Sequence, residues 1–434
     1  MSTEALARLA EERVDHRFKG LPPDADGLTV GELAAQRRNL FADGFTTPVL
    51  ALSAERLEHN LKLMETYAAR HGLAFAPHGK TSMAPLLFHR QLEHGAWGIT
   101  LAVPHQVRVA RAFGIQRVFL ANELVDPAAL RWVAAELAAD PSFRFVCYVD
   151  SVRGVELMDA ALEGATRPVD VVVELGAGEG ARTGVRTEAE CLAVADAVAA
   201  TDTLRLVGVA GYEGEVPQAD PERVRAWLTR LVALAVDLDK AGRFAHGGTP
   251  CSSEAESLGD EEIMVSAGGS AWFDTVAEVF AGIPELSLPV LKLLRSGAYV
   301  SHDDGHYRRI TPFNRAPEEG ALEPAFRLWA QVVSRPSPGQ AFANAGKRDA
   351  AYDLDLPFAQ VVRRDGVERP ATGIEVTGLS DQHAWLSTAP GAELEIGDWV
   401  GLGLSHPCTS FDKWPLIPVA EADGTVVDYV RTFF

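Results

Sequence analysis

Short apolar runs alternate with amphipathic segments of helical period between about residues 47 and 300. Because the runs are nearly continuous in apolar residues and rich in Val, Ile and Phe, they are typical of parallel strands buried on both faces. Nine strands with eight intervening helices predict a (β/α)8 TIM-type barrel with one extra strand. The runs cover 47–53, 73–80, 98–103, 117–123, 143–150, 169–176, 204–213, 262–270 and 291–299. Helical segments include 54–71, 127–139, 187–200 and 222–241.

The pattern changes at both ends of this region. Residues 1–45 are polar and lack a long apolar run, so we expect an N-terminal extension that packs on a larger body. Beyond about residue 308, short alternating strands joined by Pro, Gly and Asp turns predict a C-terminal antiparallel β domain. The predicted domains are therefore 1–45, 46–308 and 309–434. The polar, Gly/Ser-rich stretch 243–261 interrupts the rhythm and predicts a loop insertion.

Composition narrows the class of protein. The 434 residues are 47% hydrophobic and carry a net charge of −20, which argues against a nucleic-acid-binding surface or a polybasic membrane tether. No apolar run approaches the roughly 18 residues of a membrane span, and the first residues have no signal-peptide core. The four cysteines are scattered without a CxxC pair. We therefore expect a cytoplasmic protein that acts on a small molecule.

The candidate catalytic lysine is Lys80. If the strand at 47–53 is the extra one, the run at 73–80 is the first barrel strand, and it ends in Pro77-His78-Gly79-Lys80-Thr81. Active sites of such barrels lie at the C-terminal ends of the strands. A partly desolvated lysine there has a lowered pKa and can form Schiff bases with carbonyl compounds, including pyridoxal phosphate. A lysine that reaches from a strand end into solvent is an equally good reading of its position.

The candidate phosphate site is Gly268-Gly269-Ser270, after the seventh barrel strand and before a helix. Adjacent glycines allow close approach of a ligand, and barrels often bind phosphate on the loops after strands seven and eight. An ordinary Gly-rich turn is the alternative. A phosphate loop and a strand-end lysine on one rim form a more specific combination than either does alone.

Other strand ends carry further candidates. Arg182 follows the fifth barrel strand and Tyr212 ends the sixth, positions from which they could contact a cofactor ring, although residues at such positions more often belong to a solvated rim. His302 and His306 follow the eighth strand and are acid/base candidates. The stretch 176–181 matches the loose GxGxx(G/A) dinucleotide pattern, but the expected acidic residue about 20 positions later is missing, so nicotinamide binding is disfavoured.

The last candidate is a metal pair in Ser405-His406-Pro407-Cys408. In an extended segment, residues i and i+2 point to the same side, so His406 and Cys408 could bind one ion, and this ligand mix suits zinc. Two protein ligands leave coordination positions open, as in a catalytic site. A buried free cysteine beside an unrelated histidine is the alternative.

These motifs together resemble one enzyme family. The barrel-then-β-domain order and the segments PHGKTSM (77–83), GARTGV (180–185), VSAGGSAWFD (265–274) and SHPC (405–408) resemble the fold-type III, alanine racemase-like pyridoxal phosphate enzymes, in particular the D-serine dehydratase and D-threonine aldolase family. The resemblance covers about residues 46–434. It implies that Lys80 carries the cofactor, that Arg182 contacts the pyridine ring, that Gly268, Gly269 and Ser270 lie in the phosphate loop, and that the protein is a homodimer. From their positions near the strand ends, we also expect His78 and Tyr212 to contact the cofactor, and Tyr212 and His302 to be catalytic.

The metal motif favours one reaction within this family. Dehydratases of the family carry His-x-Cys with Zn2+, whereas the aldolases carry His-x-Asp with a harder divalent ion. Cys408 therefore favours a pyridoxal 5′-phosphate- and zinc-dependent dehydratase of D-amino acids such as D-serine or D-threonine, which releases a 2-oxo acid and ammonia. Retro-aldol cleavage to glycine and an aldehyde is the nearest alternative. Two further alternative functions are racemization and the non-catalytic binding of pyridoxal phosphate or an amino acid. The segments 243–261 and 301–307 differ from the dehydratase pattern and leave the accepted side chain open.

Overall fold

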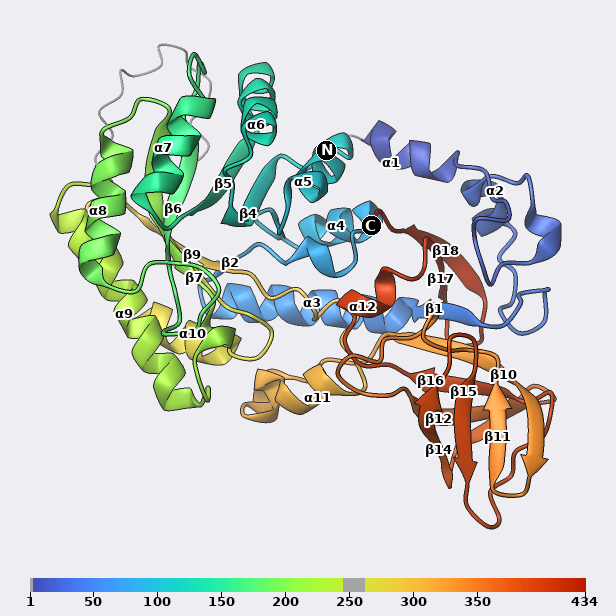
Figure 1. Ribbon diagram of the computed structural model, residues 1–434. Helices are drawn as coiled ribbons and strands as arrows, with labels where there is room; N and C mark the ends of the chain where they lie inside the picture. The colour runs from blue at the N-terminus through green and yellow to red at the C-terminus, as the bar shows by residue number, and fades with distance from the viewer. Residues whose placement is uncertain (1–2, 245–261) are drawn as a thin grey trace. The chain divides into compact units, whose positions relative to one another are not determined.

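The structure is a computed structural model that describes residues 3–244 and 262–434 (Figure 1). Its residues form two compact units. The barrel unit contains residues 65–78 and 95–296, and the β unit contains residues up to 64, 79–94 and 297–434. This division differs from the predicted boundaries at 45/46 and 308/309, because the strand at 49–53 pairs within the sheet of the β unit. Most of the predicted insertion, 245–261, lies outside the described residues.

The barrel unit is built on eight parallel strands. Their order in the sheet is β2-β9-β8-β7-β6-β5-β4-β3, and a parallel bridge between His78 and Thr100 joins the two edge strands. The predicted (β/α)8 barrel is therefore confirmed, with the run at 73–80 as its first strand. The strands are β2 Ala74–Phe75, β3 Ile99–Leu101, β4 Arg117–Glu123, β5 Arg144–Val149, β6 Val169–Leu175, β7 Leu204–Gly211, β8 Ile263–Ala267 and β9 Val290–Leu294.

Local signals in the sequence set the ends of the barrel helices. Asp126 caps α6 and Asp220 caps α9, each followed by a proline at the first helical position. Thr187 and Glu190 form a capping box at the start of α8. In the part of the chain that the structure describes, no helix has the length and apolar character to cross a membrane. The helices assigned wholly to this unit are α5 Pro104–Ala112, α6 Pro127–Ala139, α7 Val152–Ala161, α8 Glu188–Ala199, α9 Pro221–Lys240 and α10 Phe273–Ala281, with the 3-10 turn η3 Glu213–Glu215.

The β unit is built on a mostly antiparallel ten-stranded sheet. Its main path is β13-β12-β16-β10-β1-β17-β18, and β11, β15 and β14 continue from β10. The strand expected to be extra, β1, lies between β10 and β17 in this sheet, which confirms that it is not a barrel strand. The strands are β1 Val49–Ser53, β10 Phe326–Ser337, β11 Gln340–Ala343, β12 Phe358–Arg364, β13 Val367–Pro370, β14 Ile374–Leu379, β15 Ala384–Thr388, β16 Trp399–Gly403, β17 Leu416–Ala420 and β18 Val426–Arg431.

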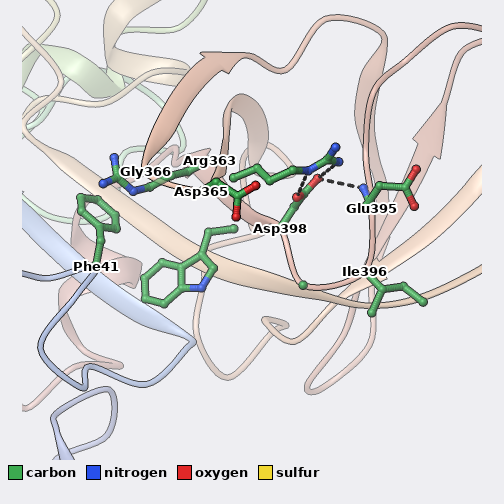
Figure 2. Close-up of a pocket in the computed structure, with 10 residues that line it drawn as sticks. Phe41, Arg363, Asp365, Gly366, Glu395, Ile396 and Asp398 are labelled. Atoms are coloured by element: carbon green, nitrogen blue, oxygen red, sulfur yellow. Dashed lines mark hydrogen bonds and ion pairs between the residues drawn. The ribbon is translucent and has the colours of Figure 1, made fainter.

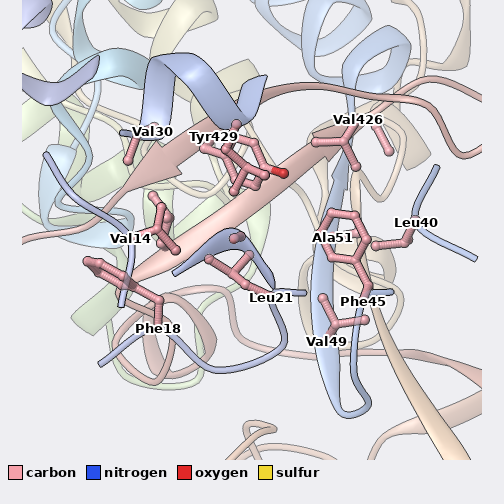
Figure 3. Close-up of a cluster of buried hydrophobic side chains, with 14 of the residues drawn as sticks. Val14, Phe18, Leu21, Val30, Leu40, Phe45, Val49, Ala51, Val426 and Tyr429 are labelled. Carbon is pink, nitrogen blue, oxygen red and sulfur yellow. The ribbon is translucent and has the colours of Figure 1, made fainter. Parts of the chain in front are cut away.

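The N-terminal segment packs on this sheet (Figure 3). Val14, Phe18 and Leu21 join a buried cluster with Val49 of β1 and Tyr429 of β18. Each apolar residue enters the cluster singly, which explains why the segment has no long apolar run. The remaining helices are α1 Thr3–Ala10, α2 Val30–Ala35, α4 Pro85–Glu93, α11 His306–Ile310 and α12 Cys408–Phe411, with the turns η1 Pro23–Ala25, η2 Gly79–Thr81, η4 Pro312–Asn314 and η5 Pro317–Glu319. Helix α3, Ala54–Arg70, contributes to both units.

Candidate active site

A polar layer closes the carboxyl end of the barrel interior. Side chains two residues apart on a strand point to the same side, so the residues that follow the apolar interior along each strand form the next layer. Glu123, Asp150, Glu174, Tyr212 and Arg295 occupy these positions. The interior below them is apolar and includes Ala76, Phe119, Val146, Tyr148, Val172, Val207, Ala210, Met264 and Leu293.

Arg295 is the buried cation of this layer. Its guanidinium carbon lies 5.1 Å from the ring centre of Phe119 and 5.7 Å from that of Tyr148. It donates to the Ser266 hydroxyl at 2.8 Å and to the Gly211 carbonyl at 2.5 Å. Arg295 therefore ties the ends of β7, β8 and β9 together with a positive charge that is only 6% exposed.

Glu123 and Glu174 form a carboxyl pair in the same layer. Burial is the main cause that raises the pKa of Glu123 to about 8, and the charge of Glu174 adds to it. Burial also raises the pKa of Glu174. The pair therefore holds a proton at neutral pH, which Glu123 donates to Glu174. Strand patterns alone did not single out this pair.

Replacing Glu123 by glutamine is expected to stabilise the protein at alkaline pH. The folded-state pKa of Glu123, about 8, lies above its ordinary value of 4.5, so folding binds a proton between these values and stability falls as pH rises through this range. The glutamine side chain does not ionise, so the stability of the variant does not fall in this way. Its unfolding free energy should equal that of the wild type near pH 4.5 and exceed it by about 1–3 kcal/mol above pH 8. Denaturant unfolding at the two pH values measures the difference.

The control for this variant is Glu156→Gln, which removes an exposed carboxylate paired with Arg153. An exposed pair of this kind contributes less than about 1 kcal/mol. If Glu123→Gln is less stable than the wild type at pH 8.5, the conclusion that the Glu123–Glu174 pair holds a proton is wrong.

Arg182 and Tyr212 lie close to each other at this end of the barrel. The Arg182 guanidinium carbon is 5.9 Å from the centre of the Tyr212 ring. However, Arg182 is 73% exposed and forms an ion pair with Glu215. Burial of the phenol, with the charge of Glu213, raises the pKa of Tyr212 to about 12, so this hydroxyl keeps its proton at neutral pH.

The predicted phosphate loop has the shape that only glycine allows. Gly268 has a φ of +102°, and a Cβ there would lie 2.1 Å from Leu294. A Cβ on Gly269 would lie 2.6 Å from the Tyr212 ring. The N–H groups of both glycines are nevertheless donated to one side chain, the buried carboxylate of Glu213. Ser270 follows this pair and precedes α10.

In the β unit, the lysine turn meets the metal motif. Lys80 lies in the turn η2, and the Cys408 Sγ donates to the neighbouring Thr81 Oγ1 at 3.6 Å. Burial alone would raise the pKa of the Cys408 thiol, but a hydrogen bond with His406, the contact with Thr81 and the charge of Lys80 together lower it. The fold thus places side chains 328 positions apart in the sequence, those of Lys80 and Cys408, within electrostatic reach of each other.

His406 is held from both sides. Its Nδ1 contacts the Asp353 carboxylate at 2.5 Å, and its backbone N–H donates to Asp303 at 2.9 Å. Asp353 also accepts from the Thr409 hydroxyl at 2.8 Å. The hydrogen bond with Cys408, followed by that with Asp353, raises the pKa of His406 to about 9. A carboxylate on one imidazole nitrogen is the arrangement that orients metal-binding histidines.

The chemistry of the two donors, His406 and Cys408, suits a zinc ion. His406 and Cys408 are hydrogen-bonded to each other, so they can serve one ion, and an imidazole with a thiolate suits zinc. Among residues 3–244 and 262–434, no group of three or more His, Cys, Asp or Glu side chains is arranged to hold a metal.

His302 lies in the β unit and is only 2% exposed. Burial is the main cause that lowers its pKa to about 4, so the imidazole is neutral at neutral pH. A neutral imidazole can accept a proton but cannot act as a cationic acid. Its neighbour Asp303 accepts N–H groups from Gly305, Tyr307 and Arg308 and thereby shapes the segment after β9.

A separate pocket of about 600 Å³ in the β unit contains none of the predicted site residues (Figure 2). Of its charged side chains, Arg364 and Asp398 pair with each other, whereas Arg363 and Glu395 pair with Glu368 and Arg335, which lie outside the lining. Arg364 binds Asp398 through two bonds of 2.6 and 2.7 Å, and the Arg363 guanidinium carbon lies 3.9 Å from the Phe41 ring centre.

Comparisons with known proteins agree with this architecture. The family model "Alanine racemase, N-terminal domain" matches residues 52–273, slightly more than half of the chain, and "Putative serine dehydratase domain" matches residues 325–420. A D-threonine aldolase from Arthrobacter sp. is 28% identical over 88% of this chain and 90% of its own. A 3-hydroxy-D-aspartate aldolase from Paracoccus denitrificans is 27% identical over 90% of this chain and 93% of its own.

Solved structures show the same fold. The D-threonine aldolase from Filomicrobium marinum has a TM-score of 0.72 at 26% identity and covers 90% of this chain and 95% of its own. A D-threo-3-hydroxyaspartate dehydratase from Delftia sp. HT23 has a TM-score of 0.67 at 23% identity, with coverage of 90% and 98%. With the family match across the barrel, these findings show that the chain belongs to the alanine racemase-like, fold-type III family of pyridoxal phosphate proteins.

Proposed function

We propose that this protein is a lyase of D-β-hydroxy amino acids that uses pyridoxal 5′-phosphate and zinc, and that its reaction is dehydration with deamination. The observation that carries the proposal is the position of Cys408 beside the Lys80 turn, 3.6 Å from Thr81. It brings a zinc-type ligand pair to the residue expected to hold the cofactor. The relatives named above, which act on D-threonine and 3-hydroxy-D-aspartate, support the substrate class.

The reaction needs an α-proton acceptor and help for a poor leaving group. Bound pyridoxal phosphate supplies an electron sink for the α-carbon. The Nζ of Lys80 would hold the cofactor and, once released by the substrate amine, accept the α-proton. His406 and Cys408 would hold zinc, whose Lewis acidity favours departure of the β-hydroxyl. For D-threonine, loss of water followed by hydrolysis gives 2-oxobutyrate and ammonia.

Two observations favour dehydration over retro-aldol cleavage. The residue two positions after His406 is a cysteine, whereas the family resemblance implies an aspartate at this position in the aldolases. Two mutant structures are known for the structurally similar D-threo-3-hydroxyaspartate dehydratase. One is a histidine-to-alanine mutant, and the other is a cysteine-to-alanine mutant in a metal-free form. The two mutated positions are two residues apart in that protein. That spacing matches His406 and Cys408.

Aldolase activity is the second candidate function, and the D-threonine aldolase that is 28% identical to this chain supports it. The test is product analysis with D-threonine, pyridoxal phosphate and zinc. We expect ammonia and 2-oxobutyrate in equal amounts, with no reaction of L-threonine. Glycine with acetaldehyde would instead establish the aldolase. A homodimer is also expected from the resemblance, and light scattering of the purified protein tests it.

A further inference from the structure

The carboxylate of Glu213 occupies the position expected for a bound anion. Glu213 begins the turn η3 after β7 and is fully buried. Its Oε2 accepts the N–H of Gly268 at 3.0 Å, and its Oε1 accepts the N–H of Gly269 at 2.5 Å. A single side chain from the neighbouring strand end therefore uses both donors of the glycine pair.

The carbonyl groups of the same glycines are also satisfied within the chain. The Ser296 hydroxyl lies 2.9 Å from the Gly269 oxygen and 3.3 Å from the Gly268 oxygen. Glu213 after β7 and Ser296 after β9 thus hold the loop after β8 from both sides. The glycine pair is a braced element, with its backbone donors and acceptors already engaged.

A phosphate at these two N–H groups would have to displace the Glu213 side chain that already accepts both of them. The Glu213 carboxylate lies in a buried environment where charges interact strongly, and moving it away would expose the two N–H groups or require the loop to rearrange. Burial raises the pKa of Glu213, and its bonds to Gly268 and Gly269 and the charge of Arg295 oppose this rise only in part. The Glu213 side chain already satisfies the N–H groups of Gly268 and Gly269, so a phosphate fits these two groups poorly.

We propose that Glu213 is a positioning residue of the cofactor loop, and that the N–H groups of Gly268 and Gly269 serve its carboxylate and not the cofactor phosphate. The inference rests on the proposed use of pyridoxal phosphate but not on the choice between dehydration and retro-aldol cleavage. It changes the role expected for Gly268 and Gly269. The two glycines give the loop its shape, while Glu213 fixes that shape before the cofactor binds.

The variant Glu213→Gln tests this role when pyridoxal phosphate is compared with pyridoxal, which lacks the phosphate. Glutamine has nearly the same shape, but its NH2 group must face one of the two N–H donors, so one charge-assisted hydrogen bond is lost and the loop loosens. We expect affinity for pyridoxal phosphate to fall about tenfold or more, and affinity for pyridoxal to change less than about twofold. Fluorescence titration of the apo form of the full chain measures both.

The control is Glu278→Gln on α10, which removes an exposed carboxylate paired with Arg225 in the same unit. It should leave both affinities unchanged. If Glu213→Gln binds pyridoxal phosphate more tightly than the wild type, Glu213 competes with the phosphate and the proposal is wrong. Equal changes for both ligands, or no change, would also overturn it.

A measurement on the wild type covers the case in which the variant does not fold. Proton exchange on binding is obtained by calorimetry at pH 8 in two buffers of different ionisation enthalpy. The phosphate, whose second pKa is about 6, is already dianionic there, so the two ligands should exchange the same number of protons. Extra proton uptake with pyridoxal phosphate would show that the carboxylate is neutralised when phosphate arrives, which contradicts the proposal. Cofactor binding is measured in every arm, so a failure of the proposed dehydration would leave these results interpretable.

Discussion

Replacing Lys80 by alanine is expected to remove lyase activity, with a fall in kcat/KM of at least about ten-thousandfold. The change removes two roles at once, the covalent attachment of the cofactor and the amine that accepts the α-proton, and a positioned acid/base group alone contributes about 10²–10⁴-fold. Borohydride treatment of the wild type followed by peptide mass spectrometry should find the reduced cofactor on Lys80. The variant should show no such product.

The control for Lys80→Ala is Lys62→Ala, which removes an exposed lysine of α3. It should keep full activity and the labelled peptide. If borohydride still fixes the cofactor to the Lys80→Ala protein, Lys80 is not the attachment residue.

The barrel was predictable because its strands are buried on both faces. A segment such as Val169–Leu175, buried at every position, leaves a continuous apolar run that helical or surface segments do not imitate. The first apolar run, at 47–53, could be assigned only because nine predicted strands are one more than a barrel needs, which made β1 the extra strand. Its partners β10 and β17 lie more than 270 positions away in the sequence, and no local pattern could identify them.

The polar layer of the barrel could be only partly predicted. Tyr212 and Arg182 were found as strand-end residues, but Glu123 was not, because a glutamate at the end of a strand looks like an ordinary solvated residue. A register shift between Leu120 and Glu123 further hides its direction from a simple two-residue repeat. Glu213 was also missed as a site residue, since only the fold shows that its carboxylate reaches across to the next strand end.

The metal pair was found from its spacing, but the extended conformation expected for it is wrong, because His406 has a φ of +57° and Cys408 begins helix α12. His406 and Cys408 are a short local pair, so their hydrogen bond follows from neighbouring positions in the chain. Their supporting residues come from elsewhere: Asp303 follows β9, and Asp353 lies in a segment between β11 and β12. An alternating acidic pair, Asp353 and Asp355, was the only local signal for that support.

Replacing Cys408 by serine, or His406 by alanine, is expected to reduce dehydration of D-threonine by at least about a hundredfold. A serine hydroxyl is a poor zinc ligand at neutral pH, so the ion that assists departure of the β-hydroxyl is lost. Bound zinc, measured by atomic absorption, should fall in parallel with the rate. The visible spectrum of the cofactor should remain, because Lys80 is intact.

A variant of Asp353 distinguishes weaker metal binding from a general loss of structure. Asp353→Asn keeps both ligands but removes the carboxylate from the His406 Nδ1, and loss of such a partner lowers metal affinity about 10–100-fold. Added zinc should therefore restore activity to Asp353→Asn but not to Cys408→Ser. Asp412→Asn, which removes an exposed carboxylate just after α12, should need no added zinc. If Cys408→Ser retains both its zinc and its rate, the metal is held elsewhere, and the main argument for dehydration over retro-aldol cleavage is lost with it.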